Sequence, residues 1–276
     1  MANEATLPRA AAPSRALGLP AALLNAARNP WLIAAAAALA VLGYWNATGS
    51  APAAFTHLWR WMPALLRGLL VNIEISVLAV AIGTVVGLVV GALSLSPLPA
   101  VRVLMRCYVQ VFRNAPILVL IYFTTYVFPF ELNIVAWTFP FPDWVKVVLG
   151  LALPTSANVA EIFRGAIQSI PSAQWEAAQS LAFKRSQIFR LVVLPQCVRR
   201  MLPPWMNLYA SITMSTSLAS LVGVHDVVDT AQIASNTVAR TDFTILVYFT
   251  LLVLFFAYCY PIARATRALE RRHERH

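Results

Sequence analysis

Long runs without a charged residue constrain most strongly what this chain can fold into. No Asp, Glu, Lys or Arg occurs in Ile75–Val101, Met201–Val224 or Phe243–Ala263. A helix needs about 20 predominantly apolar residues to cross the hydrocarbon core of a bilayer. Because lipid offers no hydrogen bonds to the backbone, such runs are expected as helices that satisfy their own N–H and C=O groups.

The composition agrees with a membrane protein. The chain is 59% hydrophobic and 12% charged, whereas soluble domains average about 45–50% apolar and about 25% charged residues. The net charge of +10 could suit nucleic acid, but the charges lie between apolar runs. The sequence therefore predicts an all-α polytopic fold, with the lipid bilayer and not nucleic acid as its surroundings.

Six spans are expected. A late signal-peptide core is the alternative for the first of them, but the polar leader before it is long and Trp45-Asn46 follow where small residues would be cut, which favours an uncleaved helix. In the second, Gly83, Gly87 and Gly91 recur every four residues, which indicates a smooth face that packs against another helix. The expected spans are about 30–46, 68–94, 105–129, 144–164, 199–222 and 243–263.

The basic residues give these spans an orientation. If the N-terminus is cytoplasmic and the chain alternates, seventeen Lys and Arg residues fall on the cytoplasmic side and four on the other. Cytoplasmic loops carry such an excess of positive charge. We therefore expect a multi-pass protein of the bacterial cytoplasmic (inner) membrane with both termini in the cytoplasm.

The longest cytoplasmic loop, 165–198, is itself amphipathic. A helix is expected after Pro171, with Ser172 as a possible cap. It would align Ala173, Ala177 and Leu181 on one stripe, with small alanines beside it. A second piece, "KRSQIFRLVVLP", leads into the next span. Two interpretations fit this loop: a pair of helices that docks into a groove of a cytoplasmic partner, or a pair of helices that lies at the membrane interface on anionic lipid.

Several separated motifs resemble one family. The segment "EAAQSLAFKRSQIFRLVVLPQ" is similar to the EAA motif of ATP-binding-cassette (ABC) importer permeases, with Ala182 where that motif has Gly. "AEIFRGAIQSIPSAQWEAAQSL" (160–181), "VVLPQCVRRMLPPWMNLYASITMSTSLASLVGV" (192–224) and "YVQVFRNAPILVL" (108–120) resemble its polar amino acid branch, the histidine, glutamine, arginine and glutamate type. The resemblance covers roughly 68–265.

The resemblance implies a type I permease core of five helices, here with one extra N-terminal transmembrane helix. The EAA loop would be a coupling helix that docks into a cytoplasmic ABC ATPase dimer, which would bind ATP-Mg; the chain itself would bind no cofactor. A second permease chain, identical or different, and an extracytoplasmic solute-binding protein would complete the assembly. The residues implied in coupling are Glu176, Ala177, Ala178, Leu181, Ala182, Leu194 and Pro195.

The same reading divides the chain. It comprises a cytoplasmic tail (1–29), an extra transmembrane helix with an outer loop (30–67), the permease domain (68–265) with its coupling loop (165–198), and a basic cytoplasmic tail (266–276). One departure from the branch is Met214-Ser215, where Lys-Asp is common. A different partner chain could compensate for this loss of charge, which would make the permease a heterodimer.

Polar residues inside spans are candidates for a translocation path. Ionisable groups in a span indicate function, although Glu74 could instead reach the interface and Ser or Thr could join helices. Glu161 and Arg164 are three apart on a helix and are expected to form a structural pair. The candidate path residues are Glu74, Asn207, Ser211, Ser215, Thr216 and Ser217.

No catalytic or metal-binding pattern is apparent, and the chain is expected not to be an enzyme. Cys107, Cys197 and Cys259 are far apart, so neither a zinc site nor a disulfide framework is implied. The leading function is the membrane subunit of an ATP-driven importer for a polar amino acid or related small solute, working by alternating access. An autonomous channel, a secondary transporter and a non-transporting scaffold are the alternatives. Arginine, glutamate, glutamine, histidine and opine-like solutes all stay open.

Overall fold

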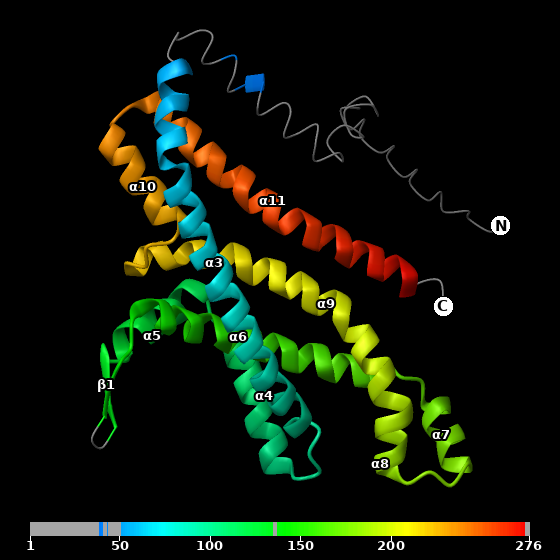
Figure 1. Ribbon diagram of the computed structural model, residues 1–276. Helices are drawn as coiled ribbons and strands as arrows, with labels where there is room; N and C mark the ends of the chain where they lie inside the picture. The colour runs from blue at the N-terminus through cyan, green and yellow to red at the C-terminus, as the bar shows by residue number, and fades with distance from the viewer. Residues whose placement is uncertain (1–38, 41–42, 44–50, 135–136, 274–276) are drawn as a thin grey trace, which may run out of the picture. The chain divides into compact units, whose positions relative to one another are not determined.

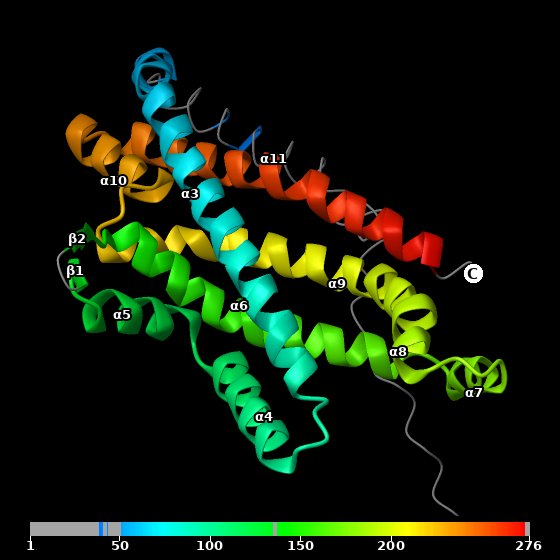
Figure 2. The same ribbon diagram turned by 60° about the horizontal axis from the view of Figure 1, so that its bottom comes forward.

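The computed structural model describes residues 39–40, 43, 51–134 and 137–273, and most of these are helical. The chain divides into two compact units, Met1–Ala53 and Ala54–His276. The span expected at 30–46 and the tail 1–29 fall almost wholly outside the described residues. The helices of the second unit are drawn in Figures 1 and 2.

Helix α3 (Ala51–Leu93) begins earlier than expected. The loop predicted to end at 67 is helical from Ala51 onward, so that boundary was wrong. Arg60 and Arg67 lower the local hydropathy, so a hydropathy argument starts the membrane span after them. Arginine is nevertheless a good helix former, so the helix itself can begin earlier. Even Pro63 lies inside α3, where it removes one backbone N–H donor.

The span expected at 105–129 is two helices. Helix α4 (Pro99–Asn114) and helix α5 (Ile117–Val127) are bent by 105° at the break between them. Ala115 is extended, with φ −74° and ψ 135°. Pro116 follows it, and proline disfavours the helical conformation in the residue before it. The expected span is therefore made of two helices rather than one continuous helix.

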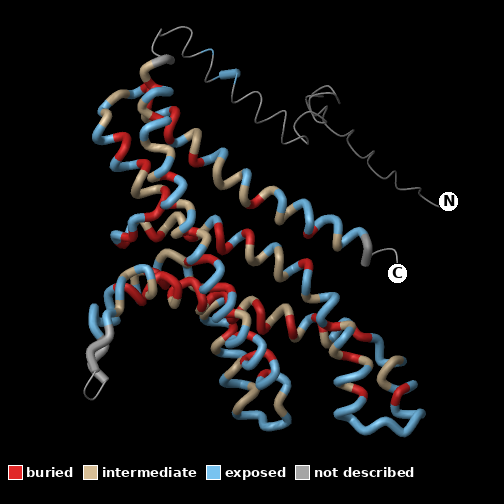
Figure 3. The backbone as a smooth tube through the Cα atoms, viewed as in Figure 1, coloured by how far each residue is buried: buried red, intermediate tan, exposed pale blue. Residues whose placement is uncertain are grey.

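A short antiparallel hairpin precedes the central helix. Strands β1 (Glu131–Ile134) and β2 (Trp137–Pro140) pair with Glu131 opposite Pro140. Helix α6 (Asp143–Gln168) follows. Of the three helices long and apolar enough to cross a membrane it is the most buried: 67% of the residues in its most apolar stretch are buried, against 44% for α3. The buried residues along α6 are visible in Figure 3. The span expected at 144–164 lies inside α6.

The fifth expected span changes type along its length. Helix α9 (Leu194–Ser215) continues as the 3₁₀-helix η2 (Thr216–Val222). The hydroxyls of Ser215, Thr216 and Ser217 each donate to a backbone carbonyl three or four residues earlier. Such bonds compete with the regular helical ladder, and 3₁₀ turns are frequent at helix ends.

Two further helices complete the unit. Helix α10 (Val227–Val238) begins at Asp226, whose carboxylate caps it by accepting from the Asp229 N–H. Helix α11 (Thr241–His273) contains the sixth expected span. Three helices are long and apolar enough to cross a membrane, or four if the bent pair α4–α5 counts as one span. Within the described residues, therefore, the exact five-plus-one count is not established.

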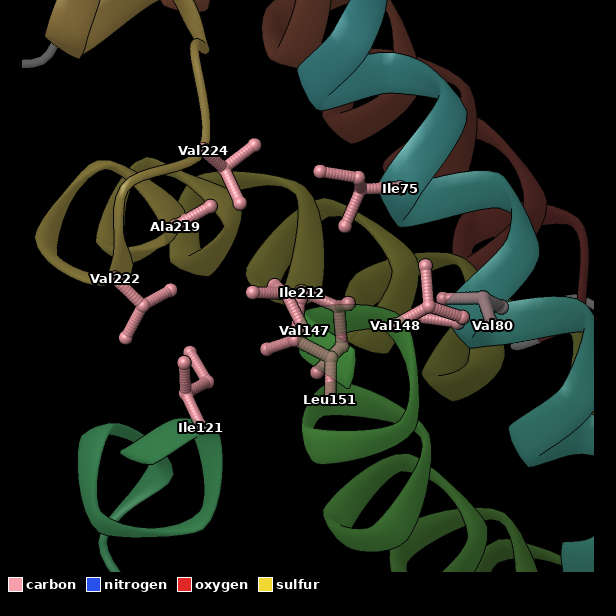
Figure 4. Close-up of a cluster of buried hydrophobic side chains, with 11 residues drawn as sticks. Ile75, Val80, Ile121, Val147, Val148, Leu151, Ile212, Ala219, Val222 and Val224 are labelled. Atoms are coloured by element: carbon pink, nitrogen blue, oxygen red, sulfur yellow. The ribbon is translucent and has the colours of Figure 1, made fainter. Parts of the chain in front are cut away.

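The core joins α3, α5, α6, α9 and η2. Figure 4 shows side chains from these elements converging, among them Ile75, Ile121, Val147 and Ile212. The glycine face of α3 lies against α6: a Cβ on Gly87 would stand 2.5 Å from the carbonyl oxygen of Ser156. The sequence-based prediction that this face packs closely against another helix is confirmed.

The long helices alternate in direction. Figures 1 and 2 place α10 and the hairpin at one end of this unit and α7 (Ser172–Ser180) with α8 (Arg185–Gln187) at the other. Helix α6 runs toward α7, α9 runs back toward α10, and α11 returns. The loop between α6 and α9 is thus presented at one end, away from α10.

Candidate functional site

The segment between α6 and α9 is a compact unit built on its own small core. Buried Ala178 of α7 packs in a cluster with Ile170, Ile188, Val193 and Cys197. Pro171 is the N-cap of α7, no side chain caps the helix by a hydrogen bond, and Ser172 is already helical. The cap expected from Ser172 was therefore wrong, while the helix itself lies where the sequence predicted it.

The opposite side of α7 is open to its surroundings. Ala173, Glu176 and Ala177 are exposed, and Leu181, just after the helix, is 71% exposed. Within the described residues, the carboxylate of Glu176 makes no hydrogen bond or ion pair. Small side chains let another backbone approach closely, and an exposed leucine beside a free acid provides both apolar and charged contacts for a partner.

The chain leaves α7 through a turn that requires one residue in the left-handed conformation. The Phe183 N–H donates to the Ala178 carbonyl at 3.2 Å, and the Ala182 N–H donates to the Gln179 carbonyl at 2.8 Å. This pair of bonds is the Schellman motif, whose C′ residue is usually glycine. Ala182 occupies that position with φ 57°. The motif thus accounts for the glycine of the family pattern. Ala182 adopts the same left-handed conformation, which is sterically strained for a residue with a Cβ.

The returning chain is tied back to α7 and α6. After α8 comes the π-helix η1 (Ile188–Val193), and Leu194 and Pro195 then open α9. Gln196 donates to the Gln174 side chain at 2.6 Å, and Arg200 donates to the Ser169 carbonyl at 2.6 Å. A cation at the C-terminal end of α6 is also favoured by the helix dipole. The first bond connects α7 with the start of α9, and the second connects the end of α6 with α9.

Four of the candidate path residues lie together. Asn207, Ser211, Ser215 and Ser217 line a cavity of about 530 Å³ on α9 and η2. The hydroxyls of Ser215 and Ser217 donate to backbone carbonyls, which leaves their oxygens as acceptors toward the cavity. The cavity wall can therefore accept hydrogen bonds from a polar solute.

Thr216 belongs elsewhere, to a buried network that sequence reasoning missed. Asn72 of α3 donates to Thr216 Oγ1 at 3.1 Å and to Asp226 Oδ2 at 3.0 Å, and accepts from the Val227 N–H at 3.0 Å. Burial raises the pKa of the Asp226 carboxyl, while hydrogen bonds from the Asp229 N–H and the Asn72 amide oppose part of that rise. The sequence did show Asn72 as a polar residue inside an apolar run. It gave no sign of its partner Asp226, which lies 154 residues further along the chain.

Glu74 lies in a separate cavity of about 500 Å³. That cavity is also lined by Asp143, Trp144 and His225. Asp143 pairs with buried Lys146 at 3.1 Å, and His225 pairs with Asp229 at 2.7 Å. The structure therefore does not bring Glu74 together with the serines of α9.

Glu161 and Arg164 are paired in α6. Arg164 donates to both oxygens of Glu161, and Arg113 of α4 approaches the same carboxylate at 3.9 Å. The pair thus also connects α6 with α4. In the part of the chain that the structure describes, no group of three His, Cys, Asp or Glu residues could hold a metal ion.

The fold defines a class: a polytopic helical membrane protein in which the loop between α6 and α9 carries a helix, α7, with one exposed face. Residues 83–275 match the family described as the inner membrane component of binding-protein-dependent transport systems. The chain belongs to this family, which confirms the resemblance drawn from its motifs.

Relatives within the family are permeases. The chain is 32% identical over 216 residues to the octopine transport system permease protein OccM of Rhizobium radiobacter, covering 77% of this chain and 87% of the relative. It is 29% identical to the probable glutamine ABC transporter permease protein GlnP of Bacillus subtilis, covering 75% and 92%.

Solved structures agree on the fold. A crystal structure of an amino acid ABC transporter with histidines matches with a TM-score of 0.69 and 24% identity, over 79% of this chain and 98% of that one. An inward-facing methionine ABC transporter, MetNI, matches with a TM-score of 0.55 and 18% identity, over 75% and 97%.

Proposed function

We propose that this chain is the membrane-spanning permease subunit of an ATP-driven importer for a polar amino acid or a related small solute. It would work as a dimer of permease chains with two cytoplasmic ATPase subunits and an extracytoplasmic solute-binding protein. Relatives named for octopine and glutamine support the solute class. ATP-Mg would bind to the ATPase subunits and would supply the free energy of transport.

The observation that carries this proposal is the open face of α7. Exposed Glu176 and Ala177 lie on one side of α7, with exposed Leu181 just after its end, and the other side packs on a small core. A rigid element that exposes small and apolar side chains is suited to a groove in another protein. Ala178 in the small core, and Leu194 and Pro195 at the start of α9, would fix the position of this face. Ala182 would terminate α7 beside it.

Alternating access would then follow from rigid connections. Gln196 links α7 to the start of α9, and Arg200 links the end of α6 to α9, so a displacement of α7 would move α6 and α9 with it. ATP and the loaded binding protein would drive the cycle by binding more tightly to one permease state than to the other. The solute would pass the cavity lined by Asn207, Ser211, Ser215 and Ser217, with Thr216 and Glu74 outside that cavity.

Co-purification tests the coupling face. The tagged chain is purified from its own host in mild detergent, and its partners are identified by mass spectrometry. We expect an ABC ATPase with the native chain and more than about tenfold less of it with Glu176→Lys, because Glu176 is the one charged residue of α7 and a reversed charge no longer fits a partner that binds a carboxylate. Glu131→Lys makes the same change in the hairpin and should retain the ATPase.

Two results would contradict the proposal. The absence of any ATPase from the native preparation, under conditions that keep membrane complexes intact, would remove the importer function. Equal recovery with both variants would show that α7 is not the contact. Uptake of radiolabelled amino acids by the reconstituted complex then identifies the solute.

A further inference from the structure

A polar cavity lies between the end of α3, α4 and α6, on side chains that the transport path does not use. Its volume is about 290 Å³. Its polar lining is Ser94, Arg106, Gln110, Arg113, Glu161 and Arg164.

The charges in this cavity do not cancel. Three arginines face one carboxylate, Glu161, which is already bonded by Arg164 and approached by Arg113. Among the described residues, Arg106 makes no ion pair or hydrogen bond. Two positive charges are therefore left over in a partly enclosed space, where an anion would be attracted more strongly than at an open surface.

The arginines also have free donors. Arg113 and Arg164 keep side-chain exposures of 42% and 33% although they contact Glu161. Each guanidinium has five N–H donors, and Glu161 with Gln168 uses only some of them. Guanidinium groups bind phosphate oxygens through paired N–H donors.

Exposed apolar side chains lie on or just before α4, the helix that carries Arg106 and Arg113. Leu98 and Leu104 are 61% and 64% exposed, and Val103 on the same helix is 56% exposed. Helix α4 thus carries basic and apolar residues side by side, as helices at the edge of a bilayer do. Figure 2 shows α4 after the loop that follows α3 and turns the chain back, and α4 packs against α6.

We propose that this cavity binds the phosphate group of an anionic phospholipid, with Arg106, Arg113 and Arg164 as its ligands. The acyl chains would lie over exposed Val103, one turn before Arg106, and along the neighbouring apolar side chains of α4. Free phosphate offers the same headgroup chemistry but leaves these apolar side chains uncovered. Basic pockets between transmembrane helices bind anionic headgroups in this way. Because lipid is present on both faces of a membrane, the site does not depend on the orientation of the chain.

The bound lipid would connect two parts of the permease. Arg106 and Arg113 belong to α4, whereas Arg164 lies one turn before the end of α6, which leads into α7. A phosphate shared by these arginines would brace the helix that carries the α7 segment.

Lipid retention tests the proposal. The native chain, Arg106→Gln and Arg102→Gln are reconstituted into phosphatidylcholine nanodiscs that contain phosphatidylglycerol, released in detergent, and examined by native mass spectrometry. Arg102 lies one turn earlier on α4 and is not part of the cavity, so it controls for loss of charge. We expect about fivefold less retained phosphatidylglycerol for Arg106→Gln only, the effect of about one basic contact.

Thermal melting separates the two sources of phosphate. Phosphatidylglycerol should raise the melting temperature of the native chain and of Arg102→Gln but not that of Arg106→Gln, while inorganic phosphate in pure phosphatidylcholine should have no effect. Equal retention of phosphatidylglycerol by the native chain and Arg106→Gln would overturn the proposal. An Arg106-dependent rise with inorganic phosphate alone would also overturn the lipid as ligand.

Discussion

At the scale of single residues, Ala182 is the departure from the family pattern that the structure explains. Its φ of 57° costs an L-residue with a side chain roughly 1–2 kcal/mol. The sequence alone left two outcomes open, a sharp turn or a helical position that prefers alanine. The Schellman bonds of Ala182 and Phe183 decide for the turn, because they require a left-handed residue between them.

Ala182→Gly is therefore expected to stabilise the protein by about 1 kcal/mol, since glycine reaches positive φ without steric cost. Ala177→Gly, inside α7, should instead destabilise by about 0.5–1 kcal/mol. Thermal melting in detergent checks both signs. A lower melting temperature for Ala182→Gly would show that the turn is not strained.

Asn72 is the second residue with a testable role, because it bonds three buried groups at once. Asn72→Ala leaves the Val227 N–H and the Asp226 carboxylate without this partner. Unsatisfied buried polar groups cost about 1–3 kcal/mol each, so we expect a loss of at least this size. Chemical denaturation or thermal melting in detergent measures it.

This loss should depend on pH. The pKa of Asp226 is raised from its ordinary value of 3.8 by burial, so the contribution of Asp226 to stability is full below that value. It decreases as the pH rises toward the raised pKa of the folded protein. Removing the Asn72 bond raises this pKa further, so the deficit of Asn72→Ala should grow as the pH rises through the raised pKa of Asp226 in the native folded protein. A deficit independent of pH would exclude Asp226 as its cause.

At the scale of elements, hydropathy located the long helices but not their ends and bends. The spans expected at 144–164 and 243–263 lie inside α6 and α11, because lipid-length apolar runs have few alternative structures. The bend at Pro116 separates α4, which carries three arginines, from the uncharged α5, and hydropathy averaged over both pieces does not locate the bend. The network of Asn72 with Asp226 depends on how α3 meets α10, and no local pattern encodes that contact.

The contact between α3 and α6 gives the prediction at this scale. In Gly87→Ala the new methyl would stand 2.5 Å from the Ser156 carbonyl oxygen, so the helices must separate. Overpacking of this kind costs about 1–3 kcal/mol. Gly165→Ala is the matched control, because a Cβ there meets nothing within 4 Å. Gly87→Ala should lower the melting temperature and Gly165→Ala should not; equal effects would contradict the close packing.

At the scale of the whole molecule, the remaining question is which end of the helices faces the cytoplasm. The positive charges predict that α7 and α8 are cytoplasmic and that α10 is on the other side. Helix α9, with η2, connects these two ends in the structure, yet it is too polar to count as a span by hydropathy. If α9 crosses the membrane, its packing against α6 and α11 stabilises it there rather than an apolar surface of its own.

Cysteine labelling in spheroplasts tests this orientation. In a chain without Cys107, Cys197 and Cys259, a single cysteine replaces exposed Ser186 in α8 or exposed Asn236 in α10. A membrane-impermeant maleimide should label Asn236→Cys directly and Ser186→Cys only after permeabilisation. The reverse pattern would invert the proposed topology and place α7 out of reach of a cytoplasmic ATPase. Labelling of both from one side would mean that α9 and η2 do not cross the membrane, so α7 and α10 would share a compartment.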